Sequence, residues 1–568
     1  MTTTRFSENR QARRFGVFGL LLAIAFSATA VQAADESSTI RLNTVGYLPK
    51  AEKVVSIATP CTNFAVVRIS DNSTVCAGKI TGPVLDADTG ESLYTADFSS
   101  VKKTGDYRLV VPGVGRSAPF HISADVYREP YHTAMLGFYL WRCGIAVSST
   151  YHGETFAHAA CHTNDAWLDY VGGGHTHKDG GKGWHDAGDY NKYTVNAGVS
   201  VGVLFRAWED FGPQLCKVRL DIPESGGKLP DFLAELKWEM DWLLTMQAPD
   251  GSVYHKLSTT QFGGFVLPEQ ETAERFFTPW GSEATADFVA MTAQAARIFQ
   301  PYDAEFAHRC LQAAQKSYQF LQAHPEYHPA DQTGFGTGLY EVNEPDHRAG
   351  GAPQNRLWAA AELWETTGSP DVLRDLETRI RTVNGHVDAD FDWDETKDLG
   401  LLTYLFSQRS GRDAALVNLV RSNLLATADG IVQTAKSDGY GRPLGSQYFW
   451  GCNGAVARQT VLLTAADRLS SGKGGYRAAC LDALNHLFGR NCYGRSFVTG
   501  IGFQPPMHPH DRRSAADNVV DPWPGYLVGG PHPKATDWHD DQGDFKTNEI
   551  AINWNAALVY ALAAFLPK

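Results

Sequence analysis

A long run of helical periodicity constrains the fold of this chain more than any other feature of its sequence. From about residue 127 onward, apolar residues recur at three- and four-residue spacing, and cap and stop residues divide the run into roughly twelve helices. Twelve helices in one domain predict six helical hairpins closed into an (α/α)6 barrel, an all-α domain over residues 126–568. The expected helices lie near 127–142, 195–210, 230–247, 284–299, 304–323, 354–366, 370–383, 397–408, 412–427, 453–469, 475–488 and 549–566.

Residues 34–125 show a different pattern, in which short β-rich runs alternate with Gly, Asp, Asn and Pro turns. Such runs occupy residues 54–57, 64–69 and 107–111. Short strands separated by regular turns in a segment of this length predict an all-β sandwich. The chain is therefore expected to have at least two domains, a β-sandwich followed by a helical barrel.

The first 33 residues are typical of a secretory signal peptide. Four arginines precede the apolar stretch 15–30, and Val31-Gln32-Ala33 offers a small-residue cleavage site. The adjacent Arg13 and Arg14 also weakly suggest twin-arginine export. No later apolar run is long enough to span a membrane, so we expect export to the periplasm or the medium.

Charge and cysteine usage narrow the class of protein. The formal net charge of −13 argues against binding to nucleic acid. Nine cysteines, odd in number and sparse, do not form a disulfide framework. Cys61 and Cys76 either pair within the N-terminal region or are buried free thiols. A P-loop, a dinucleotide fingerprint after a strand and a His-Glu-x-x-His motif are all missing from the sequence, which disfavours nucleotide enzymes and zinc proteases.

Two carboxylates, Asp186 and Asp189, stand three residues apart in the aromatic and Gly-rich loop 184–190. Two carboxylates aimed at one point can hold and deprotonate a water molecule. Asp189 is then a candidate general base, with Asp186 helping to hold the water. The alternative is a turn in which both aspartates cap backbone N–H groups before a helix.

A third carboxylate, Glu549, is expected to open the last helix. Alternate helices of the barrel run in the same direction, so the second and twelfth should present their N-termini, and these carboxylates, on one face. A general acid must stay protonated, which requires a pKa raised by burial or by neighbouring carboxylates. Asp540, Asp541 and Asp544 are candidates for that repulsion. The alternative is a first-turn glutamate that stabilises the helix.

Four further residues have the right chemistry for a metal site. Two thiolates and two imidazoles are a full tetrahedral ligand set for structural zinc, and a metal beside residue 186 would anchor the catalytic loop. The alternative is a chance occurrence of scattered cysteines and histidines. The four residues are Cys143, Cys161, His162 and His185.

Candidate sugar-binding residues lie in the C-terminal half. In the Pro-rich loop 509–514, His510 and Arg512 offer hydrogen-bond donors for sugar hydroxyls, although a solvated basic loop is the alternative. Tyr448, Trp450 and Trp554, together with Trp280 earlier in the chain, are expected to line the cleft, although helical Trp residues often lie in the core.

These segments together resemble glycoside hydrolase family 9, the inverting cellulases and related exo-enzymes. Residues 40–49 resemble the start of the family's N-terminal immunoglobulin-like domain, and residues 183–190 match its Asp-Ala-Gly-Asp motif. Residues 487–500 resemble the stretch before the His-Arg loop, and residues 547–556 match the segment that carries the acid. The resemblance implies that Asp189 is the base, that Glu549 is the acid, and that the four Cys and His residues bind zinc.

Two positions depart from the family pattern. Asp511 stands where a second histidine usually precedes Arg512, so its charge either favours a cationic sugar or faces solvent. Gln354-Asn355 stands where we expect an acidic pair near a calcium site of some members, which weakens the case for calcium there.

The sequence predicts an exported, inverting endo-β-1,4-glucanase acting on cellulose or a related β-glucan. An alternative is an exo-acting member that releases glucose or glucosamine from cello- or chito-oligosaccharide ends. A non-catalytic glycan-binding protein is a second alternative, which the three intact carboxylates disfavour. Inversion implies that Asp189 and Glu549 lie about 6.5–9.5 Å apart. The oligomeric state is not readable from the sequence.

Overall fold

Strands precede helices along the chain, as the sequence predicts. The computed structural model describes residues 36–341 and 352–568, so the predicted signal peptide of residues 1–33 lies outside the described residues. The last strand of the N-terminal β region ends at Ile122, and the first helix begins at Arg128. Within the described part of the chain, no helix is both long and apolar enough to cross a membrane.

The N-terminal strands form two sheets that enclose a core of their own. Alternate residues of the strand at 105–111 are buried (Tyr107, Leu109 and Val111), the two-residue period of a strand with one face on a core. One sheet has the order β1 (Ile40–Arg41), β3 (Val54–Ile57), β7 (Ser92–Asp97), β6 (Thr81–Leu85). The other has the order β2 (Gly46–Tyr47), β10 (Phe120–Ile122), β8 (Gly105–Val111), β4 (Asn63–Arg68), β5 (Thr74–Lys79), with β9 (Gly115–Arg116) on β8. Cys61 and Cys76 are free thiols, so the disulfide considered for them is not formed.

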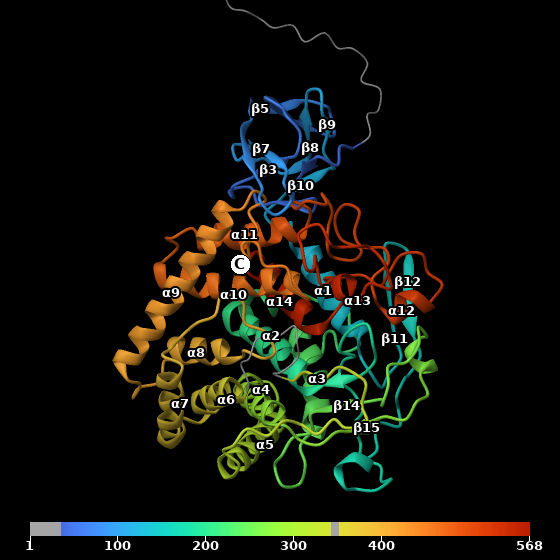
Figure 1. The fold of residues 1–568 in the computed structure, drawn as a ribbon, viewed down its shortest axis with the longest axis vertical. Helices are drawn as coiled ribbons and strands as arrows, with labels where there is room; N and C mark the ends of the chain where they lie inside the picture. Colours follow the sequence, from blue (N-terminus) through green and yellow to red (C-terminus); the bar gives the residue numbers. More distant parts are fainter. Residues whose placement is uncertain (1–35, 342–351) are drawn as a thin grey trace, which may run out of the picture. The chain divides into compact units, whose positions relative to one another are not determined.

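Twelve long helices and two short ones follow among the described residues (Figure 1). The long helices are α1 (Arg128–Leu140), α2 (Thr194–Leu215), α3 (Asp231–Thr245), α4 (Ser282–Phe299), α5 (Ala304–Ala323), α6 (Ala352–Thr367), α7 (Pro370–Thr382), α8 (Lys397–Phe406), α9 (Ala414–Ser437), α10 (Cys452–Ser470), α11 (Tyr476–Leu487) and α14 (Ile552–Ala563). The short ones are α12 (Arg512–Ala516) and α13 (Phe545–Asn548). The loops carry a hairpin of β11 (Val147–Tyr151) and β12 (Glu154–His158), and a small sheet of β13 (Lys192–Tyr193), β14 (Lys256–Ser258) and β15 (Phe276–Phe277).

Alternate long helices form the inner ring of a barrel. Helix α14 packs between α2 and α10, α4 packs between α2 and α6, and α6 also packs on α8. The inner helices are buried on almost every face, whereas the outer helix α9 buries only a stripe at helical spacing, which includes Leu416, Val420 and Leu424. The predicted (α/α)6 barrel is confirmed.

Small residues allow the inner helices to approach closely. A Cβ added at Gly198 of α2 would lie 2.8 Å from the Asp287 carboxylate of α4. A Cβ at Gly202 would lie 2.6 Å from the Trp358 ring and 2.8 Å from Leu399. Helix α2 therefore requires glycine at these two contacts with other inner helices.

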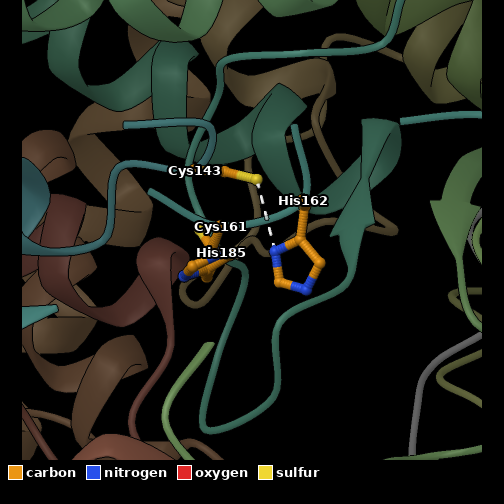
Figure 2. A group of neighbouring side chains, drawn as sticks. All are labelled: Cys143, Cys161, His162 and His185. Carbon is orange, nitrogen blue, oxygen red and sulfur yellow. Dashed lines mark hydrogen bonds between the residues drawn. The ribbon is translucent and has the colours of Figure 1, made fainter. Parts of the chain in front are cut away.

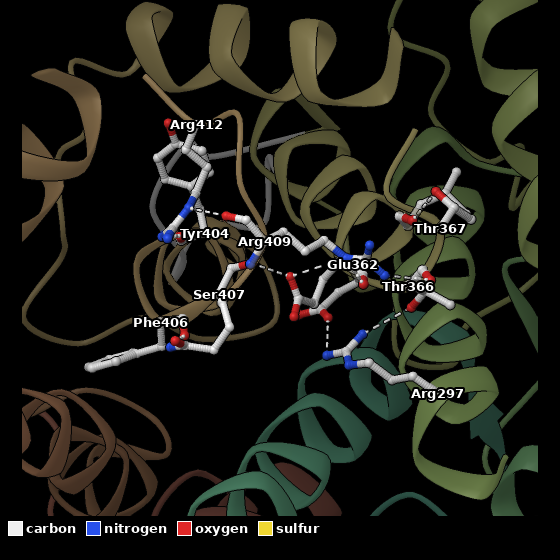
Figure 3. A network of polar contacts seen from close by, with 12 residues as sticks. Arg297, Glu362, Thr366, Thr367, Tyr404, Phe406, Ser407, Arg409 and Arg412 are labelled. Atoms are coloured by element: carbon white, nitrogen blue, oxygen red, sulfur yellow. Dashed lines mark hydrogen bonds and ion pairs between the residues drawn. The ribbon is translucent and has the colours of Figure 1, made fainter. Parts of the chain in front are cut away.

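A polar network holds the C-terminal end of α6 (Figure 3). The buried carboxylate of Glu362 pairs with Arg297 of α4. Arg409, in the loop after α8, donates hydrogen bonds of 2.6 and 3.0 Å to the backbone oxygens of Glu365 and Thr366. Carbonyls in the last turn of a helix have no partner within it, so Arg409 satisfies groups that would otherwise be left unpaired.

We expect Gly202→Ala to destabilise the protein by about 1–3 kcal/mol, because the added methyl group overpacks the contact between α2 and Trp358. Gly430→Ala is the matched control, since that glycine is exposed in α9 and a Cβ there meets nothing within 4 Å. The control should be neutral or more stable by about 0.5–1 kcal/mol. Chemical denaturation measures both variants, and equal stability for the two would contradict the packing argument.

Candidate active site

The three carboxylates predicted to act together line a single pocket. They come from segments directly before the N-termini of α2 and α14, and a third segment, before α10, supplies another wall. The barrel therefore brings together residues that lie far apart in the sequence. The lining residues are Asp186, Ala187, Asp189, Tyr193, Phe262, Gly338, Leu339, Tyr340, Asp392, Trp393, Trp450, Glu549, Ala551, Asn553 and Trp554.

A glycine allows the loop that carries both aspartates to sit against the loop at 509–512. A Cβ at Gly188 would lie 2.1 Å from the backbone oxygen of His510, so this position tolerates no side chain. The backbone N–H of Arg512 also donates a hydrogen bond of 3.1 Å to the backbone oxygen of Gly188. The Ile552 N–H also donates to the backbone oxygen of Asp186 at 2.9 Å, which ties the loop to the start of α14.

Each buried aspartate is fixed by two donors. Asp186 accepts hydrogen bonds from Tyr340 at 2.7 Å and from Asn196 at 2.8 Å. Asp189 accepts from Asn191 at 2.7 Å and from Tyr193 at 3.1 Å, both through Oδ2. The second oxygen of Asp189 is not used by these donors, which leaves it available to a water molecule.

Glu549 lies outside the last helix, which corrects the expectation that it opens it. Helix α14 begins at Ile552 with Ala551 as its N-cap, while Glu549 is extended and forms a parallel bridge with His510. Ile550 and Ala551 separate Glu549 from the first helical residue, so Glu549 does not lie in the first turn, where the helix dipole would favour its ionised form.

Burial is the largest cause of the raised pKa at all three carboxyls. At Glu549 the charges of Asp189 and Asp186 add to burial, and its pKa lies well above the usual range. The expected repulsion from residues 540, 541 and 544 is thus replaced by repulsion within the pocket. Burial and Asp189 raise the pKa of Asp186 to about 8. Burial also raises the pKa of Asp189, but Arg512 and two hydrogen bonds oppose this shift. The pKa of Asp189 is therefore raised less than that of Glu549, so Asp189 ionises more readily and Glu549 keeps its proton to higher pH.

Two of the four aromatic residues expected in the cleft line the pocket, namely Trp450 and Trp554. Trp280 does not, and its ring stacks on His328 with the ring centres 4.0 Å apart. Tyr448 does not, which corrects that prediction: it lines a separate small cavity, stacks on Arg442 and donates to Asp88 of the β-sandwich at 2.9 Å. Outside a helix or strand, a tyrosine two residues from a cleft tryptophan can point into the cleft or away from it, because the spacing does not fix the direction of its side chain.

Several pocket residues were not singled out from the sequence. Phe262, Tyr340 and Trp393 supply aromatic surface, and Asn553 donates to Asp392 at 2.9 Å. The residues at 262, 340 and 393 lie in irregular loops, where periodicity gives no signal. Asn553 lies within the segment that resembles the family motif, so its position could have been noted.

Asp511 neither faces solvent nor contributes charge to the pocket, so both expectations for it are wrong. Its side chain is 1% exposed, accepts from the N–H groups of Arg513 and Ser514, and pairs with the Arg513 side chain at 3.0 Å. It is the N-cap of α12. Its neighbour Arg512 points elsewhere, donating two bonds of 3.2 Å to the backbone oxygen of Gly263.

The predicted metal ligands lie together beneath the catalytic loop (Figure 2). Cys143 Sγ is 3.7 Å from His162 Nδ1, and Cys161 Sγ is 3.6 Å from His185 Nε2. All four donor atoms lie within 4.8 Å of one another. Tetrahedral zinc with its usual bond lengths separates sulfur and nitrogen by about 3.6 Å. The cluster therefore has the chemistry and the spacing to hold a metal ion.

At the position considered for calcium, the Asn355 side chain forms a hydrogen bond with a neighbouring helix. Its amide nitrogen donates to Asp287 Oδ1 of α4 at 2.8 Å. Burial raises the pKa of Asp287 well above its usual value. Asn355 thus serves as a donor to a buried carboxyl, a role that an aspartate at this position could not fill.

A family model described as glycosyl hydrolase family 9 matches residues 127–562. The chain belongs to this family. A second model, described as the cellulase N-terminal Ig-like domain, matches residues 35–116 of the family 9 enzyme. The predicted fold class and family membership are therefore confirmed.

The family 9 enzyme is similar along nearly its whole length to known glycosidases. Endoglucanase D from Acetivibrio thermocellus is 54% identical, covering 97% of this chain and 87% of that protein. A crystal structure of a metagenome-derived family 9 endoglucanase has a TM-score of 0.86 at 33% identity, covering 93% and 98% of the two chains. A Zn-binding triple mutant of another family 9 endoglucanase has a TM-score of 0.84 at 32% identity, covering 92% and 99%.

We expect Arg512→Gln to move both limbs of the pH profile of kcat/KM to higher pH. Arg512 lowers the pKa of Asp189 and of Glu549, so without its charge the base ionises, and the acid deprotonates, only at higher pH. Rates measured across the pH range test this, with exposed Lys534→Gln as the control. An unchanged profile in Arg512→Gln would show that its charge does not tune these carboxyls.

Proposed function

We propose that this chain is an exported, inverting endo-β-1,4-glucanase that hydrolyses cellulose or a related β-glucan. The observation that carries the proposal is the convergence of Asp186, Asp189 and Glu549 on one pocket, in which the pKa of Glu549 is raised further than that of Asp189. The similarity to Endoglucanase D supports the substrate class. The signal-like residues 1–33 support export.

In this proposal Asp189 accepts a proton from water, and Asp186 helps to hold that water. The water attacks the anomeric carbon from the face opposite the leaving group, and Glu549 protonates the departing glycosidic oxygen. The separation of about 6.5–9.5 Å between Asp189 and Glu549 stays a prediction of the inverting mechanism. Arg512 holds Asp189 toward its ionised form before each turnover.

The aromatic walls of the pocket suit a chain of sugar rings. Trp450 and Trp554 offer flat apolar surface on one side, and Phe262 and Trp393 offer it on others. The Asp392 carboxylate and the Asn553 amide provide polar groups that can meet ring hydroxyls. Glucosamine is less well supported than glucose, because the charge of Asp511 is used within α12.

We also propose that the Cys143, Cys161, His162 and His185 cluster holds structural zinc. Bound zinc would supply a cross-link between the end of α1, the loop after β12 and the catalytic loop, without entering the chemistry. The adjacency of His185 to Asp186 explains why such a cross-link matters for activity.

Proton NMR of a cellohexaose digest tests the proposed function directly. An inverting endoglucanase gives the α-anomer first at each new reducing end, with cuts inside the chain. An initial β-anomer would contradict inversion. Release of glucose alone from chain ends would replace the endo assignment with the exo-acting alternative.

We expect Glu549→Gln to lower kcat on cellohexaose by about 10²–10⁴-fold, because the variant cannot protonate the leaving oxygen. Its melting temperature should change little, since the amide keeps the size of the side chain. Asp541→Asn, at an exposed position in the same C-terminal region, is the control and should keep full activity. Near-normal turnover by Glu549→Gln would rule this residue out as the acid.

We expect the purified protein to contain about one zinc per chain and Cys161→Ser to lose it, because a hydroxyl is a poor substitute for a thiolate ligand. The variant should also melt at a lower temperature, since metal binding contributes to folding. Metal analysis and thermal unfolding measure both effects, with exposed Cys216→Ser as the control. Equal zinc in Cys161→Ser and the parent would place the metal elsewhere.

A further inference from the structure

Glu271 is a buried carboxylate outside the catalytic pocket and outside the metal ligands. Its side chain is only 6% exposed, and it ends the loop 261–271 between β14 and β15. A buried carboxylate is costly unless it has charged or hydrogen-bonding partners. Its two oxygens face two different parts of the molecule, and each contact has a consequence for the active site.

One oxygen of Glu271 faces a metal ligand. Glu271 Oε2 lies 3.3 Å from Nε2 of His162, whose other ring nitrogen faces Cys143 Sγ at 3.7 Å. With Nδ1 turned toward the metal position, the proton of the neutral imidazole lies on Nε2, 3.3 Å from the carboxylate oxygen, and neither of these two buried atoms has another hydrogen-bond partner among the described residues. A carboxylate in this place fixes the tautomer and the orientation of the ligand ring.

The other oxygen of Glu271 faces the loop that holds the active-site arginine. A Cβ at Gly263 would lie 2.1 Å from Glu271 Oε1, so the carboxylate packs directly on the backbone of that glycine. The Gly263 carbonyl in turn accepts both bonds from Arg512. The Arg512 guanidinium also lies 5.6 and 5.8 Å from the ring centres of Phe262 and Phe265, in the same loop.

We propose that Glu271 is a positioning residue that couples the metal cluster to Arg512 in the active site. The route runs from His162 through the carboxylate to the Gly263 backbone, and from there to the guanidinium. Metal occupancy then sets the position of the cation that keeps Asp189 ionised. The catalytic half of this inference rests on the proposed function, whereas the metal half does not.

Zinc affinity is the first test, because it needs no substrate. By competition with a chromophoric chelator, Glu271→Ala should bind zinc about 10- to 100-fold more weakly than the parent. Glu271→Gln, which keeps the shape of the side chain, should show a smaller loss and guards against misfolding of the alanine variant. Glu274→Gln, at an exposed position in the same region, should match the parent. Parental zinc affinity in both Glu271 variants would overturn the proposal.

A double-mutant cycle on zinc-saturated protein is the second test. If Glu271 acts through Arg512, the combined Glu271→Gln and Arg512→Gln variant should lose about as much kcat/KM on cellohexaose as Arg512→Gln alone. Additive losses would overturn the proposed route. Coupling is reciprocal, so Arg512→Gln should also weaken zinc binding. The zinc affinity of Arg512→Gln can be measured even if the parent protein fails to cleave cellohexaose. Failure to cleave cellohexaose would contradict the glucanase proposal and leave the coupling between Glu271 and Arg512 to be judged by zinc affinity.

Discussion

The active site depends on one close backbone contact, in which Gly188 meets the carbonyl of His510 with no room for a side chain. This contact brings the loop that carries the base against the segment beside Glu549. Hydrogen bonds from Arg512 and Ile552 to the same loop hold it there. Packing thus requires the glycine of the Asp-Ala-Gly-Asp motif, while the two aspartates beside it are the residues proposed to act on the water.

Burial alone does not distinguish the roles of the three carboxyls, because it raises the pKa of each. What separates them is the placement of charge around them. Arg512 and two hydrogen bonds favour the ionised form of Asp189, while the two aspartates themselves favour the protonated form of Glu549. The Arg512 guanidinium opposes the effect of burial at Asp189, and the contacts that position it extend as far as the metal cluster.

The sequence predicts the barrel well because helical periodicity is a local signal that survives into the fold. It also predicts that Asp186, Asp189 and Glu549 meet, since alternate helices of a closed ring share a direction. It fails at Tyr448, whose side chain is directed by a partner distant in sequence, Asp88. It also fails at Asp511, whose side chain turns to Arg513 and Ser514 at the start of its own helix. Likewise, the donors Tyr340 and Asn196 belong to an irregular segment and to a helix interior, where no spacing marks them as partners of Asp186.

The place of α14 in the ring has a consequence for how the protein is made. This helix packs between α2 and α10, and the residue proposed as the acid directly precedes it in the chain. A ribosome delivers the metal ligands and both aspartates early, and α14 only after eleven other long helices. Until α14 docks, the ring stays open and the pocket lacks Glu549. Hydrolytic competence should therefore appear in one step when α14 docks, rather than grow with the length of the chain.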